Sequence, residues 1–307
     1  MKFINKYNLP PDIFKACAAE QYEPKLDRIG VTSLIAPAHI RQLALKHWND
    51  LEIDASTRLW AVLGEAIHLV MDKYNKPEGK EPIRKFEAII DGVTVVGIVD
   101  TFNINETGII TDYKCTSVFS FLGGLKKEWE QQLNCYAWLA EKKGITIKGL
   151  KISAILRDWI VSKAKQADYP KIPFQAVDVP LWPLEKTENF IRFRLAEHQK
   201  DDILCTPEER WQKPDVYAVM KKGQKKAVAC NKYRGNEKTP FTENDANDYI
   251  KYHSSDKLYV EKRPGGCTRC QNQSYCAVSK FCSFFQKNYA KPTKFCTNYK
   301  VEKTLGD

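Results

Sequence analysis

Two aspartates and a lysine in the middle of the chain have the types and spacing that metal-assisted hydrolysis needs. Asp100 ends the run GIVD, and Asp112 and Lys114 lie in the run TDYK. Residues two apart on a strand project from the same face, so Asp112 and Lys114 would point together. Carboxylates suit Mg²⁺, and a neighbouring lysine can orient the attacking water and balance charge in a phosphoryl-transfer transition state.

The same residues also have an ordinary structural explanation. An aspartate at a strand end commonly caps a turn, and an aspartate and a lysine two apart often lie on a solvated face. Both acids, however, follow strongly apolar runs, VTVVGIV and GIIT. Charge in such surroundings is costly unless it is paired or bound to a metal, which favours a metal site.

Four of the ten cysteines lie within 16 polar residues near the C-terminus, and they have the spacing of metal ligands. They are Cys267, Cys270, Cys276 and Cys282. The usual role of a cysteine, a small buried hydrophobe, suits Cys115 and Cys135 but not this segment. Thiolates at such spacing suit Zn²⁺ or an iron–sulfur cluster, and the spacing alone does not choose between them.

The segment that carries the two aspartates is expected to form three strands. Residues 85–116 are rich in β-branched side chains, with turn signals at residues 91–92 and 106–108. This pattern predicts three strands joined by two tight turns. A hairpin at residues 106–108 would place the strand ends that carry Asp100 and Asp112 side by side.

Helices are expected on both sides of these strands. Apolar residues recur at helical spacing over residues 55–74, with Asp54 as a candidate N-cap, and again over residues 125–139. A strand over residues 145–160 follows, and Pro183 opens a helix that ends near residue 199. This order predicts an α/β fold with a mixed sheet.

Composition sets the broad class of protein. The chain has 48 Lys and Arg against 38 Asp and Glu, a formal charge of 48 − 38 = +10, and 43% hydrophobic residues, which excludes a disordered protein. No apolar run approaches the roughly 20 residues of a membrane-spanning helix, and the first residues lack the apolar core of a secretory signal. We therefore expect a cytoplasmic protein without a membrane partner, in which clustered cysteines bind metal rather than form disulfides.

Four short motifs resemble, in order, those of the PD-(D/E)XK nuclease superfamily. They are GEAIH at residues 64–68, GIVD at 97–100, DYK at 112–114 and QLNCY at 132–136. The closest branch is that of the RecB-like exonucleases, which includes the CRISPR-associated members and their phage relatives. Phage-type members also carry a stretch that resembles CTPEERW at residues 205–211, followed by a cysteine-rich tail. The resemblance covers most of residues 30–285.

The resemblance implies a restriction-endonuclease-like mixed sheet flanked by helices, and it implies roles for single residues. Asp100 and Asp112 resemble the carboxylate ligands of Mg²⁺ or Mn²⁺. His68 resembles the helix histidine of the metal shell, and the backbone carbonyl of Tyr113 resembles a further ligand. Lys114 resembles the catalytic lysine.

Three further residues match less constant positions. Glu87 matches an acidic position that would hold a second metal or a water. Gln132 and Tyr136 are four apart on one helix face and match a pair that contacts DNA or supports the site. Tyr136 fits the apolar core equally well.

The cysteine tail resembles that of the iron–sulfur RecB-like nucleases, which favours a [4Fe–4S] cluster over Zn²⁺. In many of those relatives a fourth cysteine precedes the nuclease core, where this chain has His39 and no cysteine. The ligands are therefore expected among Cys267, Cys270, Cys276 and Cys282, with Cys205 as the alternative to Cys267.

These features predict a lead-in over residues 1–30, a nuclease core over 31–205 and a cysteine-rich segment over 206–307. The expected activity is that of a Mg²⁺- or Mn²⁺-dependent DNA exonuclease in recombination, repair or phage DNA processing, acting on single strands or duplex ends. The alternatives are a structure-specific endonuclease and a non-catalytic DNA-binding protein with a structural metal site. A second copy of the chain and a recombination protein are the candidate partners.

A basic segment is one candidate for DNA contact. Residues 141–171 carry eight Lys and Arg and three acids, 8 − 3 = +5, with Trp159 and Tyr169 among them. Positive charge with aromatic rings is what a single-strand groove uses. A solvated lysine face explains the same segment equally well.

Overall fold

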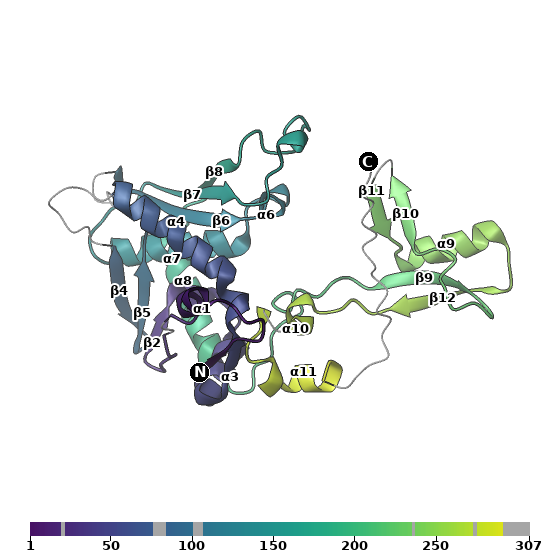
Figure 1. Ribbon diagram of the computed structural model, residues 1–307, viewed down its shortest axis with the longest axis horizontal. Coiled ribbons are helices and arrows are strands. Elements are labelled where there is room, and N and C mark those ends of the chain that lie inside the picture. The colour runs from purple at the N-terminus through teal and green to yellow at the C-terminus, as the bar shows by residue number, and fades with distance from the viewer. Residues whose placement is uncertain (20–21, 76–83, 101–106, 235–236, 273–274, 291–307) are drawn as a thin grey trace. The chain divides into compact units, whose positions relative to one another are not determined.

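The computed structural model describes the chain apart from residues 20–21, 76–83, 101–106, 235–236, 273–274 and 291–307 (Figure 1). The chain divides into two compact units, Met1–Leu204 and Cys205–Asp307. Helices and small sheets occur in both, so the predicted mixed α/β class is confirmed. None of the helices among the described residues is long and apolar enough to cross a membrane.

The first three-stranded sheet of the first unit has the order β2-β5-β4. Its strands are β2 (Arg28–Gly30), β4 (Lys85–Ile90) and β5 (Val93–Ile98). The predicted tight turn at residues 91–92 joins β4 to β5, with Ile90 opposite Val93. Asp91 and Gly92 have φ values of 49° and 75°, as a two-residue hairpin turn requires.

The second three-stranded sheet has the order β6-β7-β8. Its strands are β6 (Ile109–Thr116), β7 (Gly149–Leu156) and β8 (Phe174–Val179). β6 runs parallel to β7, with Asp112 opposite Ile152, and β8 is antiparallel to β7.

The predicted hairpin between β5 and β6 is not formed, because the two strands belong to different sheets. The proposed turn at residues 106–108 lies partly outside the described residues. A side-chain contact replaces strand pairing here: the backbone N–H of Tyr113 on β6 donates to the carboxylate of Asp100. The side chain of Asp100 therefore joins the end of β5 to β6, and no strand-to-strand hydrogen bonds between β5 and β6 are needed for this.

Helix α7 (Lys127–Glu141) forms the centre of the first unit, because it packs against strands of both sheets. Its inner face includes Leu133 and Leu139, which are fully buried together with Phe86 and Ile152 of the sheets. Helix α4 (Leu59–Asn75) lies against β6 and crosses in front of it in Figure 1. β6 thus contacts one helix that carries His68 and another that carries Gln132.

The first 30 residues contribute to the fold, whereas the sequence suggested a loose lead-in. β1 (Lys2–Ile4) pairs in parallel with β3 (Glu52–Asp54), and β2 joins the first sheet. The remaining short elements of this unit are α1 (Pro11–Cys17), α3 (Ala38–His47), η1 (Trp48–Asp50), η2 (Ala55–Arg58), α6 (Phe119–Leu122) and η3 (Val161–Lys163). Asp54 caps η2 by accepting from Ser56 N–H, so its predicted capping role is confirmed.

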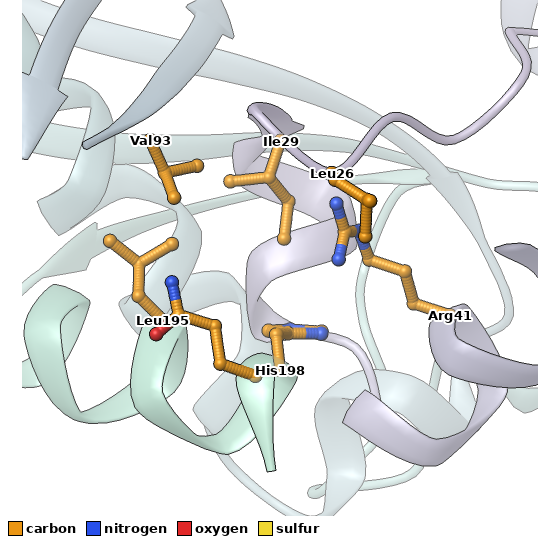
Figure 2. Close-up of a pocket in the computed structure, with 7 residues that line it drawn as sticks. Leu26, Ile29, Arg41, Val93, Leu195 and His198 are labelled. Atoms are coloured by element: carbon orange, nitrogen blue, oxygen red, sulfur yellow. The ribbon is translucent and has the colours of Figure 1, made fainter. Parts of the chain in front are cut away.

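Helix α8 (Leu184–Gln199) is tied to the end of α2 (Val31–Ile35) by two buried basic side chains. Arg194 donates to the carbonyls of Leu34 and Ala36, and Nε2 of His198 lies 3.0 Å from the Leu34 carbonyl. These contacts satisfy carbonyls that a helix end leaves unpaired. His198 and Arg41 also line a small pocket between α8 and the sheet, shown in Figure 2, which contains none of the predicted site residues.

The described residues of the second unit form two strand pairs and one helix of more than two turns, besides the short elements of the cysteine segment. β9 (Val216–Lys221) pairs with β12 (Leu258–Arg263), and β10 (Asn231–Arg234) pairs with β11 (Glu237–Pro240). Thr242 and Asp245 form a capping box at the start of α9 (Glu243–His253). The cysteine segment forms α10 (Thr268–Gln271), η5 (Ser279–Phe281) and α11 (Ser283–Asn288).

Candidate active site and cysteine cluster

Asp100 joins three elements of the first unit at the end of β5. Its Oδ1 lies 3.2 Å from Nδ1 of His68 on α4. Its Oδ2 accepts a 3.0 Å hydrogen bond from Tyr113 N–H on β6. One carboxylate therefore fixes the distance between β5, α4 and β6.

Asp112 lies on β6 beside this contact, and its residue is only 4% exposed. Burial raises the pKa of its carboxyl, Lys114 lowers it and the nearby charge of Asp100 raises it. The ammonium of Lys114 is 2.7 Å from Oδ2 of Asp112, so the two side chains share one face as predicted. This contact is an ion pair without hydrogen-bond geometry, and no described residue donates a hydrogen bond to that oxygen.

Lys114 is held from its other side by α7. Its ammonium donates to Oε1 of Gln132 at 3.0 Å, and Nε2 of Gln132 donates to the hydroxyl of Tyr136 at 2.8 Å. Burial raises the pKa of Tyr136, whose hydroxyl also bonds with Thr32. Tyr136 is thus both a core residue and the end of a hydrogen-bond chain that positions Lys114.

His68 lies at the open side of this group. Its hydrogen bond with Asp100 raises the pKa of the imidazole, and burial partly offsets this rise. The edge of its ring faces the ring of Tyr113, with 6.5 Å between the centroids and 71° between the planes. α4 therefore presents one imidazole directly to the acidic pair.

Glu87 is not brought to this group, although the sequence resemblance placed it there. It lies on the face of β4 opposite the buried Phe86, and its side chain is 47% exposed. Arg28 on β2 donates to its carboxylate at 2.9 Å. Strand alternation explains the outcome, because Glu87 and Phe86 must project to opposite faces.

Arg84, which was not predicted from the sequence, also contributes to the surroundings of Asp100. Its Nε donates to the Val99 carbonyl at 2.7 Å, and its guanidinium pairs with Asp72 at 2.8 Å. It also approaches Asp100 to 3.9 Å. Nothing in the local sequence distinguishes Arg84 from a surface arginine, because its partners come from α4 and from the far end of β5.

The aromatic residues of the basic segment do not form an open groove. Trp159 donates to the Pro170 carbonyl, and Tyr169 accepts from Ile160 N–H. Both rings pack against the hydrophobic core. They hold the connection between β7 and β8 in place. Neither ring is therefore free to stack with DNA bases between the lysines of this segment.

The two carboxylates and the imidazole are groups that suit Mg²⁺ or Mn²⁺, and the lysine beside them is a cation rather than a ligand. Asp100 lies against His68, and Asp112 is ion-paired with Lys114. Over the described part of the chain, no group of three or more His, Cys, Asp or Glu side chains, the cysteines of the tail included, is arranged so that it could hold a metal ion. The fit is therefore chemical: the carboxylate oxygens of Asp100 and Asp112 are the ligands that hard cations prefer.

The CTPEERW segment and the first cysteines of the tail lie together in the second unit. Thr268 N–H donates to the Trp211 carbonyl, and Arg269 N–H donates to the Arg210 carbonyl, both at 3.2 Å. An isolated bridge also joins Gln212 to Cys267. The two stretches that the sequence singled out are thus one structural element.

These backbone contacts gather the thiols. Burial, and after it the charges of Glu209, Cys276 and Cys282, raise the pKa of Cys205 to about 12. Burial, together with Cys267, Cys276 and Cys282, raises the pKa of Cys270 to about 11. Clustered thiols with raised pKa values are poor nucleophiles but become good soft ligands once a metal displaces their protons.

Comparisons with known proteins identify no family. No family model matches the chain, and no curated protein matches it. A solved structure titled "Crystal structure of SSO0001" matches with a TM-score of 0.41 and 16% identity, covering 65% of this chain and 87% of that chain. A likeness at this level does not establish a shared fold.

Proposed function

We propose that this protein is a Mg²⁺- or Mn²⁺-dependent deoxyribonuclease with a restriction-endonuclease-like core of the RecB-like exonuclease type. One observation carries the proposal: the Asp112–Lys114 pair lies beside the Asp100–His68 pair, and a part-buried hydrogen-bond chain joins Lys114 through Gln132 to Tyr136. The four motifs that resemble this family supply all six of these residues. The contacts support the proposal, because the order of the motifs along the chain does not by itself require their residues to meet in space.

Asp100, Asp112 and His68 would hold the metal ion, with the Tyr113 carbonyl as the further ligand that the resemblance implies. When bound, such an ion supplies Lewis-acid polarisation of a phosphate and lowers the pKa of a bound water. The buried carboxylate of Asp112 is the part of the site best suited to it, because hard cations prefer oxygen ligands.

Lys114 would position the attacking water and balance the charge that develops on the phosphate. Its side chain is held between Asp112 and Gln132, so it loses little freedom when substrate arrives. Gln132 is a positioning residue in this scheme, because it acts through Lys114. An ammonium aimed at a developing negative charge is a common form of transition-state stabilisation.

We further propose that the cysteine cluster holds a [4Fe–4S] cluster, or Zn²⁺ in its place, in a structural role. The convergence of Cys205 with Cys267, Cys270, Cys276 and Cys282 supports ligation by four of these five thiols. Soft thiolates suit both groups. The role is structural because the segment has little other core.

The nuclease proposal is tested with Asp112→Asn and Lys114→Ala in the full chain. Both variants should lose at least about a hundredfold in the rate of Mg²⁺- or Mn²⁺-dependent degradation of linear DNA, since each removes electrostatic stabilisation. The matched control is Asp178→Asn on β8, an acid whose side chain is 86% exposed, and it should retain the parental rate. Full activity in either site variant contradicts the proposal.

The substrate type is tested with linear single-stranded, linear duplex and closed circular DNA. An exonuclease needs an end, so it should degrade the linear forms and leave closed circles intact. Cutting of closed circles would favour the endonuclease alternative. Binding without cutting of any form would favour the non-catalytic alternative.

A further inference from the structure

An arginine and an exposed tryptophan lie together next to the candidate active site. The guanidinium of Arg157, directly after β7, is 4.3 Å from the centre of the Trp60 ring on α4. Trp60 is 62% exposed, so most of the free energy available from burying its ring is not used by the fold. A cation–π contact at an exposed position contributes only about 0.5–1 kcal/mol to stability, which leaves the ring unexplained by packing.

A second open ring lies on the segment next to the end of β7. Phe119 on α6 is 81% exposed. Two hydrogen bonds hold this segment to the end of β7: Arg157 N–H donates to the Thr116 carbonyl at 3.0 Å, and Val118 N–H donates to Asp158 at 2.7 Å. The start of α6, which carries Phe119, is therefore held close to the backbone of Arg157.

A third cation lies near both this surface and the candidate active site. Lys126, just before α7, lies 5.0 Å from the Trp129 ring. Burial lowers the pKa of Lys126, Glu128 raises it, and the positive charges of Arg157 and Lys114 lower it. Lys126 is therefore close enough to both Arg157 and Lys114 for their charges to interact.

We propose that Trp60, Phe119, Lys126 and Arg157 form a strand-entry surface that binds unpaired DNA leading to the carboxylates. This inference rests on the proposed nuclease function and specifies its substrate as a single strand. Unpaired bases stack on open aromatic rings, whereas the faces of duplex bases are hidden. The cations can meet the phosphates, and of the two acids nearby, Glu128 and Asp158, the second accepts a hydrogen bond from the backbone N–H of Val118 rather than pairing with either cation.

Binding of a fluorescent oligothymidine of about 15 nucleotides, a length that fits such surfaces, tests this inference. The binding protein is the full chain with Asp112→Asn, so that DNA is not consumed. Trp60→Ala and Arg157→Gln, each added to it, should weaken binding about tenfold, and Arg157→Gln should lower the slope of log affinity against log salt by about 0.7. The matched control is Lys186→Gln, because the Lys186 ammonium lies 4.1 Å from the Trp182 ring in the same kind of pair on α8, and it should bind like the parent.

The outcomes separate this inference from the proposed function. If both surface variants bind oligothymidine as tightly as the parent, the inference is overturned. It is also overturned if the variants lose as much affinity for blunt duplex DNA as for oligothymidine. In either case, degradation of DNA by the wild-type chain leaves the nuclease proposal intact. The reverse result, weakened single-strand binding in the variants but no degradation by the wild type, supports the surface and overturns the nuclease. If Trp60→Ala fails to fold, Arg157→Gln still decides, since its side chain is exposed.

Discussion

Asp112 and His198 are both buried ionisable residues, yet they are stabilised in different ways. Burial raises the pKa of the Asp112 carboxyl, and the ammonium of Lys114, 2.7 Å away, opposes that rise. His198 avoids charge: burial lowers its pKa to about 4, an effect that the hydrogen bond to the Leu34 carbonyl opposes and that nearby Arg194 and Arg41 reinforce. The ion pair of Asp112 belongs to the candidate active site, whereas the neutral His198 helps to hold α8 against α2.

His198 predicts a loss of stability at mildly acidic pH. In the unfolded chain its pKa is near 6.5, and in the folded chain it is about 4. Between these values the unfolded state binds the proton and the folded state does not, so the free energy of unfolding falls as pH falls from about 6.5 to about 4. The shift is worth about 3 kcal/mol at most.

Urea denaturation of the wild type and of His198→Gln across this pH range measures the effect. Glutamine can still donate to the Leu34 carbonyl but does not titrate, and the carboxylates of the protein are common to both chains. The wild type should therefore lose more stability than the variant between pH 6.5 and 4. Parallel pH profiles for the two chains would show that His198 does not titrate as stated.

Two elements meet at Gly97, where the absence of a side chain brings α7 close to β5. A Cβ at this position would lie 2.7 Å from Cδ1 of Tyr136 and 2.9 Å from Cδ1 of Leu139. Tyr136 is buried and anchors Gln132, which in turn contacts Lys114. The glycine of the GIVD motif therefore supports the lysine through two side chains, those of Tyr136 and Gln132.

Gly97→Ala is predicted to destabilise the fold and to weaken catalysis. Overpacking at this contact should cost about 1–3 kcal/mol in the free energy of unfolding, because the Tyr136 ring has no room to move away. DNA degradation should fall in kcat more than in KM, since Lys114 would be misplaced rather than lost. Urea denaturation and steady-state kinetics measure the two effects.

The matched control for this prediction is Gly123→Ala. A Cβ at Gly123 meets no atom within 4 Å, and its φ of −94° is open to other residues. This variant should therefore show parental stability and activity. Equal effects of the two alanine substitutions would mean that the contact between Gly97 and Tyr136 is not the cause.

At the scale of the whole molecule, the two units differ in how they are stabilised. The first has an extended hydrophobic core around α7, whereas the cluster of the second around Val219, Phe241 and Ala246 is much smaller, and its other buried residues include Cys267, Cys270 and Cys282. A small core rarely suffices without a staple such as a metal. The cysteines would supply the ligands of the metal group proposed above.

Cys276→Ser is predicted to lose the bound group and to unfold the second unit selectively. After anaerobic purification, the wild type should contain iron with the absorption of a cluster, or stoichiometric zinc if zinc takes its place, and the variant should contain neither. The variant should also be cut faster by protease beyond residue 205. Cys230→Ser is the control, because Cys230 lies in the same unit and contacts Asn231 rather than the cluster.

A wild-type protein without iron or zinc after anaerobic purification would contradict the metal proposal. Retention of the metal by Cys276→Ser would instead remove Cys276 from the ligand set. A colourless protein with one zinc per chain would mean that the structural group is zinc rather than an iron–sulfur cluster.

Features that depend on a few adjacent residues could be predicted from the sequence. The Asp91–Gly92 turn follows from the ease with which these residues adopt positive φ. The start of α8 after Pro183 follows from the fixed φ of proline. The shared face of Asp112 and Lys114 follows from the period of two in a strand.

Which strands and rings meet was decided only by the tertiary structure. β5 and β6 are consecutive along the chain yet lie in different sheets, because β6 pairs with β7 and Asp100 takes the backbone N–H of Tyr113. The same long-range packing turns Glu87 outward, packs the partly buried Trp159 against the core and leaves Trp60 open beside Arg157. Local residue types determine turns, caps and strand faces, but pairing and burial depend on contacts between distant segments, whose free energy no short stretch of sequence contains.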